Sequence, residues 1–116
     1  MLTVYGLKNC DTCRKARKWL DGQKIAYRFV DVRDDGVSAT TIATWVGGLG
    51  LDAVVNRRST TWRSLPTEER ETLTSSNAAR FLVAHPTLIK RPVFDNGGKL
   101  AIGFTDATKD ALQGRN

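Results

Sequence analysis

In one stretch, Leu2-Thr3-Val4-Tyr5-Gly6-Leu7-Lys8-Asn9-Cys10-Asp11-Thr12-Cys13, an apolar run is followed at once by the only two cysteines of the chain. The apolar run, residues 2–7, predicts a strand, and residues 14–20 predict a helix. A Cys-x-x-Cys placed between a strand and a helix, at the start of a βαβ unit, indicates thiol redox chemistry. This stretch therefore predicts both the beginning of an α/β fold and a reactive thiol site.

The first cysteine of the pair, Cys10, stands where the predicted helix begins. Unsatisfied backbone N–H groups and the positive end of the helix dipole both favour a thiolate there. Such sites lower a thiol pKa from about 8.5 to between roughly 3.5 and 7.5, and Lys8, Arg14 and Lys15 add positive charge nearby. We predict Cys10 as the exposed nucleophile. Cys13 either resolves a disulfide with Cys10 or is a helix position that merely tolerates cysteine.

A helical segment follows the first strand–helix–strand unit. Residues 25–32 predict a second strand, parallel to the first because a helix connects the two. Residues 37–86 are mostly helical in pattern, with Ser38 expected as an N-cap and Gly47-Gly48 as the end of the first of these helices.

The last third of the chain returns to strands. Asp95-Asn96-Gly97-Gly98, flanked by strand-like residues, predicts a β-hairpin, and Thr105 is expected to cap a final helix. The order βαβ, helical insert, ββα is that of a thioredoxin-like α/β fold, with a mixed sheet flanked by helices. We predict one domain over residues 1–116, with the helical insert at about 37–86.

Composition narrows the function classes. The chain has 116 residues, 41% of them hydrophobic, and a formal net charge of +6. No apolar run approaches the roughly 18 residues of a membrane span, and no basic-then-apolar leader precedes the first strand, so we expect a cytoplasmic protein with no membrane partner. The basic residues form separated groups, which favours small anionic partners over direct nucleic-acid binding. Two cysteines with a single distant histidine, His85, predict no metal site.

Three motifs carry a resemblance to a known family. They are Asn9-Cys10-Asp11-Thr12-Cys13-Arg14-Lys15-Ala16, then Asn56-Arg57-Arg58-Ser59-Thr60-Thr61-Trp62-Arg63, then His85-Pro86 with Ile89-Lys90-Arg91-Pro92. Together, and over nearly the whole chain, they resemble the ArsC/Spx/YffB family of arsenate-reductase-like proteins with a thioredoxin-type fold. Residues 60–63 and the overall length are most similar to the YffB branch, whereas the Cys-x-x-Cys is the pattern of Spx.

The resemblance implies roles for individual residues. Cys10 matches the nucleophilic cysteine of the family. Arg91 matches the arginine before a family proline that is typically cis, Pro92, and is implied to hold an oxyanion or a glutathione carboxylate. Arg58 matches a second basic position, and a guanidinium suits such contacts because its fixed fork meets an oxyanion bidentately. Lys8 is the third basic residue that we assign to this anion-binding group.

The implied function is a glutathione-linked thiol–disulfide reductase. Glutathione would be a co-substrate and not a bound cofactor, either glutathione or Cys13 would resolve the Cys10 intermediate, and glutaredoxin is a candidate partner of the monomer. One alternative is a redox-sensing regulator similar to Spx, which binds RNA polymerase. Another is arsenate reductase proper, but residues 6–9 lack the histidine of those enzymes, residues 101–103 lack an arginine, and Asn56 replaces another.

Overall fold

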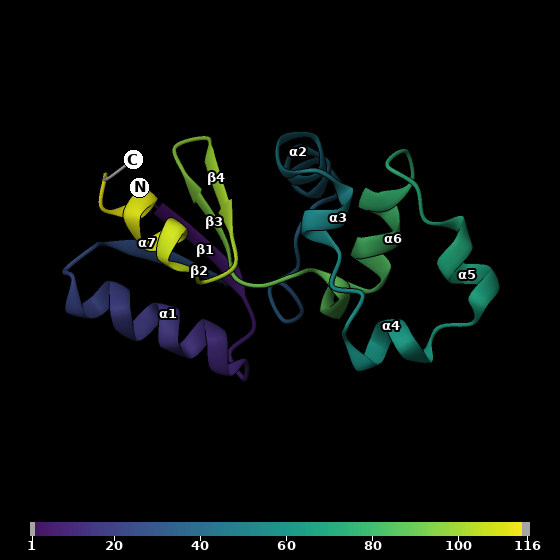
Figure 1. Ribbon diagram of the computed structural model, residues 1–116, viewed down its shortest axis with the longest axis horizontal. Coiled ribbons are helices and arrows are strands. Elements are labelled where there is room, and N and C mark those ends of the chain that lie inside the picture. Colours follow the sequence, from purple (N-terminus) through teal and green to yellow (C-terminus); the bar gives the residue numbers. More distant parts are fainter. Residues whose placement is uncertain (1, 115–116) are drawn as a thin grey trace. The chain divides into compact units, whose positions relative to one another are not determined.

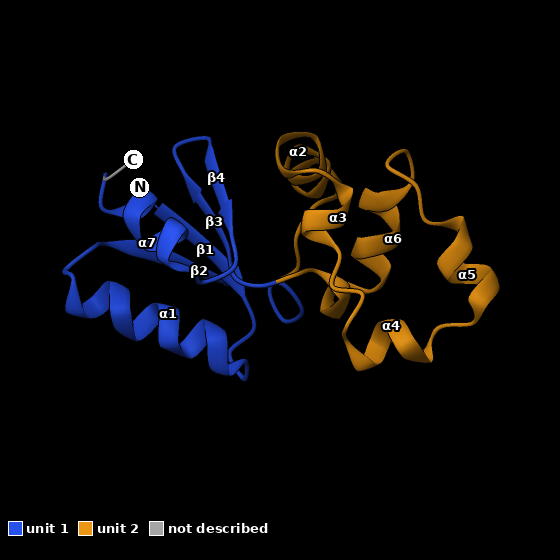
Figure 2. Cartoon of the chain, viewed as in Figure 1, with its two compact units in different colours: residues 1–35, 91–116 blue, residues 36–90 orange. Residues whose placement is uncertain are grey.

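The computed structural model describes residues 2–114, which divide into two compact units. Within the described range, the first unit holds residues 2–35 and 91–114 and the second holds residues 36–90 (Figure 2). The segment predicted to be helical, 37–86, lies inside the second unit. Folding of residues 1–116 as a single domain stays a prediction.

The first unit is built on a four-stranded mixed sheet (Figure 1). Its strands are β1 (Leu2–Gly6), β2 (Tyr27–Asp31), β3 (Val93–Asn96) and β4 (Lys99–Ile102), in the order β2-β1-β3-β4. β1 runs parallel to β2 and antiparallel to β3, and β3 is antiparallel to β4. Helix α1 (Asp11–Gly22) connects β1 to β2, and α7 (Asp106–Leu112) follows β4. The predicted βαβ and ββα halves are confirmed.

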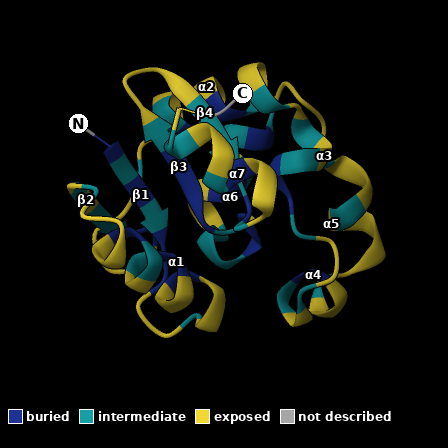
Figure 3. Ribbon diagram, turned by 60° about the vertical axis from the view of Figure 1, so that its left-hand side comes forward, coloured by how far each residue is buried: buried dark blue, intermediate teal, exposed yellow. Residues whose placement is uncertain are grey.

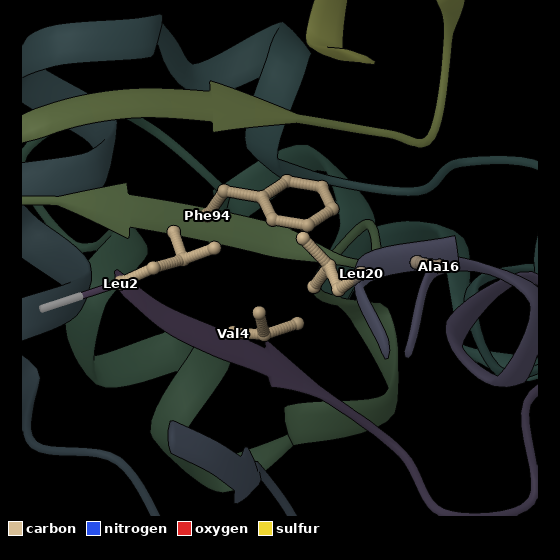
Figure 4. Close-up of a cluster of buried hydrophobic side chains, with 5 residues drawn as sticks. All are labelled: Leu2, Val4, Ala16, Leu20 and Phe94. Atoms are coloured by element: carbon tan, nitrogen blue, oxygen red, sulfur yellow. The ribbon is translucent and has the colours of Figure 1, made fainter. Parts of the chain in front are cut away.

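One face of the sheet carries the hydrophobic core of this unit. Its centre consists of side chains from β1, β3 and α1 that point toward one another (Figure 4): Leu2, Val4, Ala16, Leu20 and Phe94. Trp19 of α1 and Leu112 of α7 pack against the same cluster, so both helices cover this face. Phe94 is fully buried, and burying a side chain of that kind stabilises a fold by about 1.5–3 kcal/mol. Figure 3 shows buried positions in both β1 and β3.

The hairpin between β3 and β4 forms where the turn residues predict it. Gly97 and Gly98 have φ angles of 62° and 95°, a region open to glycine without steric cost. The Gly98 N–H also donates to Oδ1 of Asp95 at 2.8 Å. The chain therefore reverses at this point for reasons contained in four consecutive residues.

The second unit is helical. Its elements are α2 (Ala39–Leu49), α3 (Leu51–Val54), α4 (Thr60–Ser64), α5 (Thr67–Thr72), α6 (Ala78–Ala84) and the 3₁₀ helix η1 (Pro86–Leu88). Ile42 and Trp45 of α2 and Leu82 of α6 are buried in its interior. An antiparallel bridge between Val55 and Ile89 joins the residue after α3 to the residue after η1.

Two features of this unit differ from the sequence-based expectations. Gly47 and Gly48 do not end α2, which continues to Leu49 and stops at Gly50. Gly50 has φ 90° and donates its N–H to Val46 O, so it provides the positive-φ termination that the earlier glycines do not. Helix α4 was not predicted from the pattern, although Ser59 caps it by accepting the Trp62 N–H at 3.1 Å.

Helix length bears on membrane insertion. The longest helix is α1, with 12 residues, whereas a span needs about 20 apolar residues. Across residues 2–114 no helix is both long and apolar enough to cross a bilayer.

Candidate functional site

Cys10 occupies the N-cap of α1. Its backbone is extended, with φ −95° and ψ 123°, and its carbonyl accepts the Arg14 N–H at 2.9 Å, the first bond of the helix. Its own N–H donates to Leu7 O at 3.2 Å, which closes a four-residue turn between β1 and the helix. The side chain is half-buried. Cys10 therefore stands at the start of the helix, as the sequence predicts, and its side chain makes no capping hydrogen bond.

The surroundings of Cys10 favour its thiolate. Burial, the largest single influence, raises the pKa of Cys10, but the backbone N–H and the thiol of Cys13, together with Arg91, lower it by more. The positive charge of Arg91 acts in the same direction. The pKa of Cys10 is thus lowered below its ordinary value, and a lower pKa gives more of the nucleophilic form at neutral pH.

Cys13 has the opposite character. It is fully buried, and burial is the main reason that its pKa is raised to about 11, with the neighbouring Cys10 raising it further. The Leu7 N–H and the charge of Arg91 act against this rise. Space for the sulfur depends on Gly6, because a Cβ at that position would lie 2.6 Å from Cys13 Sγ. The two thiols are in contact, but they differ in exposure and in charge state.

Arg91 and Pro92 reach the thiol site through strand pairing. β3 begins at Val93, which pairs with Tyr5 near the end of β1, so the residues just before β3 lie beside the loop that carries Cys10. The Arg91-Pro92 peptide bond is cis and Pro92 is buried. The Pro92 carbonyl accepts the Gly103 N–H at 2.9 Å. Of the predicted anion-binding residues, Arg91 is the one that the structure brings to Cys10.

The other basic residues are placed differently. The Lys8 ammonium lies 3.9 Å from an oxygen of Asp34, and both side chains are more than half exposed. Arg14 donates to Asp11 at 2.9 Å, which holds its guanidinium beside the first turn of the helix. An exposed pair of this kind contributes at most about 1 kcal/mol and remains free to exchange partners. Anion binding by Lys8 stays a prediction.

Arg58 belongs to the second unit. It is exposed, and its backbone N–H donates to Oδ1 of Asn56 at 3.1 Å. Together with Arg57 and Lys90 it lines a shallow hollow whose acidic member, Asp52, pairs with Arg57 at 2.7 Å. Because Cys10 lies in the first unit, a joint role for Arg58 in its anion site stays a prediction.

Asp31 is a site residue that sequence reasoning missed. It ends β2, is fully buried, and accepts the backbone N–H of Lys8 at 3.0 Å through Oδ2. The signal in the sequence is a lone acidic residue at the end of a predicted strand, three positions before the acidic pair Asp34-Asp35. A buried carboxylate requires hydrogen-bond donors, and the sequence does not say where these are.

The structure combines a thiol at a strand–helix junction, a cis proline beside it and a mixed sheet. The comparison with protein families agrees with this combination. The family model described as "ArsC family" matches residues 5–112. The chain belongs to the ArsC family. The predicted resemblance is thereby confirmed over nearly the full length, and the fold is the thioredoxin-like fold of ArsC proteins.

Three relatives place the chain within the ArsC family. An uncharacterized protein of Haemophilus influenzae is 43% identical over 106 residues, covering 91% of this chain and 93% of the relative. The global transcriptional regulator Spx of Bacillus subtilis is 26% identical, covering 91% and 82% of the two chains. The solved structure of a YFFB protein has a TM-score of 0.90 and 37% identity, covering 97% and 98%. This ArsC-family chain therefore has relatives both in the YffB branch and among regulators.

Proposed function

We propose that this ArsC-family protein is a glutathione-linked thiol–disulfide reductase in which Cys10 is the nucleophile. The proposal rests on one observation above all: a half-buried thiol at a helix N-cap, with its pKa lowered by the Cys13 N–H and by Arg91. A thiol of this kind is a better nucleophile at neutral pH than a free cysteine, because a larger fraction of it is thiolate.

The chemistry is three successive thiol–disulfide exchanges. The Cys10 thiolate attacks one sulfur of a substrate disulfide, forming a mixed disulfide and releasing the other half as a thiolate. A glutathione thiolate then attacks the Cys10 sulfur of the mixed disulfide, which releases the second half of the substrate as a thiolate and leaves glutathione on Cys10. A second glutathione thiolate attacks the glutathione sulfur of that disulfide and returns Cys10 to the thiolate. Two glutathione molecules are oxidised to one glutathione disulfide, and the substrate disulfide is reduced to two thiols.

Glutathione is favoured over Cys13 as the resolving thiol. With a pKa of about 11, Cys13 is almost wholly protonated at neutral pH, and its burial keeps an external partner away from it. Once Cys10 is in a mixed disulfide it carries no negative charge, so one of the two influences that raise the Cys13 pKa disappears. Burial still raises the Cys13 pKa, and Cys13 remains the slower nucleophile.

The same proposal assigns the residues that would contact an anionic substrate, the cellular compartment and the partners. Arg91 would hold a carboxylate of glutathione or an oxyanion substrate beside Cys10, with Lys8 and Arg58 as further contacts. The protein would act as a cytoplasmic monomer, with glutaredoxin as a candidate partner, and would bind neither membranes nor nucleic acid directly.

The test is a coupled reduction assay. Purified protein is supplied with a small disulfide, glutathione, glutathione reductase and NADPH, and NADPH consumption is followed. The Cys10→Ser variant should lose all thiol-dependent turnover, whereas Cys13→Ser should retain most of it. Mass spectrometry of the trapped intermediate should find glutathione on Cys10. Full activity of Cys10→Ser would remove Cys10 from the mechanism.

A second candidate is a redox-sensing regulator. The observation in its favour is the buried second thiol in contact with Cys10, in a chain that is 26% identical to a protein named Spx. Capture of the RNA polymerase alpha subunit should then depend on whether the cysteine pair is oxidised. Redox-dependent capture without disulfide turnover would favour the regulator over the reductase.

Arsenate reduction is the third candidate, and we expect little of it. Residues 101–103 offer no arginine, and the loop before Cys10 offers no histidine. Arsenate consumption with glutathione and glutaredoxin should be weak or absent under conditions where the disulfide assay gives turnover.

A further inference from the structure

Asp31 is a buried carboxylate with no part in the exchange chemistry proposed above. It lies at the end of β2, in register with Gly6 at the end of β1, and its side chain is fully buried. Its two oxygens accept three backbone N–H groups: Oδ2 from Lys8 at 3.0 Å, and Oδ1 from Arg33 at 2.9 Å and Asp34 at 2.8 Å. The carboxylate thus joins the loop after β1 to the turn after β2.

These donors keep Asp31 ionised. Burial, the largest influence, raises the pKa of the carboxyl group, but the three N–H donors and the charge of Arg33 lower it further than burial raises it. A buried carboxylate without such donors would be strongly destabilising. The arrangement therefore holds both loops by charge-assisted hydrogen bonds, which are stronger than neutral ones.

The loop that Asp31 holds is the turn that places both thiols. Residues 7–10 form one turn, closed by the Cys10 N–H on Leu7 O at 3.2 Å. Within it, the Leu7 N–H faces the Cys13 thiol, and the next amide, that of Lys8, faces Asp31. Consecutive amides of one turn are thus committed to Cys13 and to Asp31, while the last residue of the turn carries the nucleophile.

We propose that Asp31 is a positioning residue for the thiol pair: through the Lys8 N–H it anchors the turn 7–10 and so fixes the position of Cys10 Sγ relative to Cys13 and Arg91. Asp31 touches no substrate in this role. The inference rests on the proposed nucleophilic role of Cys10 but not on which disulfide is reduced. It can therefore be tested on the thiol itself.

The direction of the effect separates positioning from simple electrostatics. A nearby negative charge opposes a thiolate, so removal of the Asp31 charge alone would lower the pKa of Cys10. Loss of alignment acts in the opposite direction, because the thiolate moves away from the Cys13 groups and the Arg91 charge that lower its pKa. A raised Cys10 pKa in a variant that has lost a negative charge is explained by positioning.

The first variant is Asp31→Asn. An amide has one acceptor end and one donor end, so it can serve one of the two loops and must oppose the N–H groups of the other. Alkylation of Cys10 by iodoacetamide is followed against pH, with site-resolved mass spectrometry of the reduced protein. We expect the rate at pH 7 to fall at least threefold and the midpoint of the profile to move to higher pH, with no loss of rate at the alkaline plateau.

The matched control is Asp35→Asn. It removes the same charge from the same turn, and its amide oxygen can still accept the Asp31 N–H that Asp35 Oδ2 accepts at 2.9 Å. It leaves the contact between Asp31 and Lys8 in place, so the Cys10 midpoint should stay or move slightly to lower pH. An Asp31→Asn midpoint that is unchanged, lowered or equal to that of Asp35→Asn would overturn the inference.

A second pair of variants removes the N–H donor of Lys8 instead of the carboxylate acceptor of Asp31. This pair tests the same hydrogen bond if Asp31→Asn does not fold. Lys8 is the second residue of the turn, where proline is favoured, and its φ is not positive. Lys8→Pro deletes the N–H that reaches Asp31, and Lys8→Ala controls for the lost ammonium group. The Cys10 midpoint should be higher in Lys8→Pro than in Lys8→Ala, and equal midpoints would refute the role of this bond. Absence of disulfide turnover with the expected alkylation profiles would count against the proposed function alone.

Discussion

A methyl group at position 6 is the sharpest probe of the packing beneath the thiol pair. A Cβ on Gly6 would lie 2.6 Å from Cys13 Sγ, and 3.4 Å from both Cys13 Cβ and Phe29 Cε1. The 3.4 Å contacts are ordinary van der Waals contacts, whereas the contact with the sulfur is too short to persist. Cys13 is fully buried on a helix, where few side-chain rotamers are available to move the sulfur aside.

The expected change in the free energy of unfolding of Gly6→Ala follows from two opposing effects. Overpacking of a core by one methyl group costs about 1–3 kcal/mol. Gly6 lies in a strand and does not have a positive φ, so alanine restricts the unfolded chain and returns about 0.4–1 kcal/mol. The expected net loss for Gly6→Ala is therefore roughly 1–2 kcal/mol, which corresponds to a fall of about 1 M in the urea midpoint.

The assay is urea unfolding under reducing conditions for Gly6→Ala, Cys13→Ala and the double variant. Removal of the sulfur leaves the new methyl group with ordinary contacts only, so the double variant should be more stable than the sum of the single losses by at least about 1 kcal/mol. Purely additive losses would refute the reasoning, because they would show that the methyl group and the sulfur do not compete for one space.

Three further outcomes are expected, for the two thiols, for Asp31 and for the N-cap of α2. In the reduced protein at pH 7, iodoacetamide should label Cys10 and leave Cys13 unlabelled, since their pKa values are lowered and raised to about 11 respectively; equal labelling in a peptide digest would contradict the assignment. The lowered folded-state pKa of Asp31 means that its ionised form stabilises the fold above the unfolded value of about 3.9, and that this contribution is lost as pH falls through the lower folded value. The unfolding free energy should therefore drop more steeply in acid for the wild type than for Asp31→Asn, and parallel curves would show that Asp31 is not the group responsible. Ser38→Ala should cost about 1 kcal/mol, because Ser38 Oγ accepts the Thr41 N–H at the start of α2; an unchanged urea midpoint would show that the cap contributes nothing.

Much of the fold was predictable because its signals are local. The caps Ser38 and Thr105, the hairpin turn at residues 95–98 and the helix start at Cys10 are each decided by groups within about four positions of one another. Gly47-Gly48 shows the limit of that reasoning. Glycine weakens a helix but does not end it when the buried face, with Ile42 and Trp45, holds the helix together.

The sequence by itself determined that Cys10 stands at a helix N-terminus, because a strand, a short loop and a helix follow one another there without any distant contribution. Only the tertiary structure decided how the two thiols differ. The approach of Arg91 and the anchoring of the turn by Asp31 depend on strand pairing between distant segments, and the burial of Cys13 depends on the packing of α1 on β1 at Gly6. The physical reason is that a helix end supplies its dipole and N–H groups locally, whereas desolvation, charge contacts and buried hydrogen bonds exist only once the sheet has assembled.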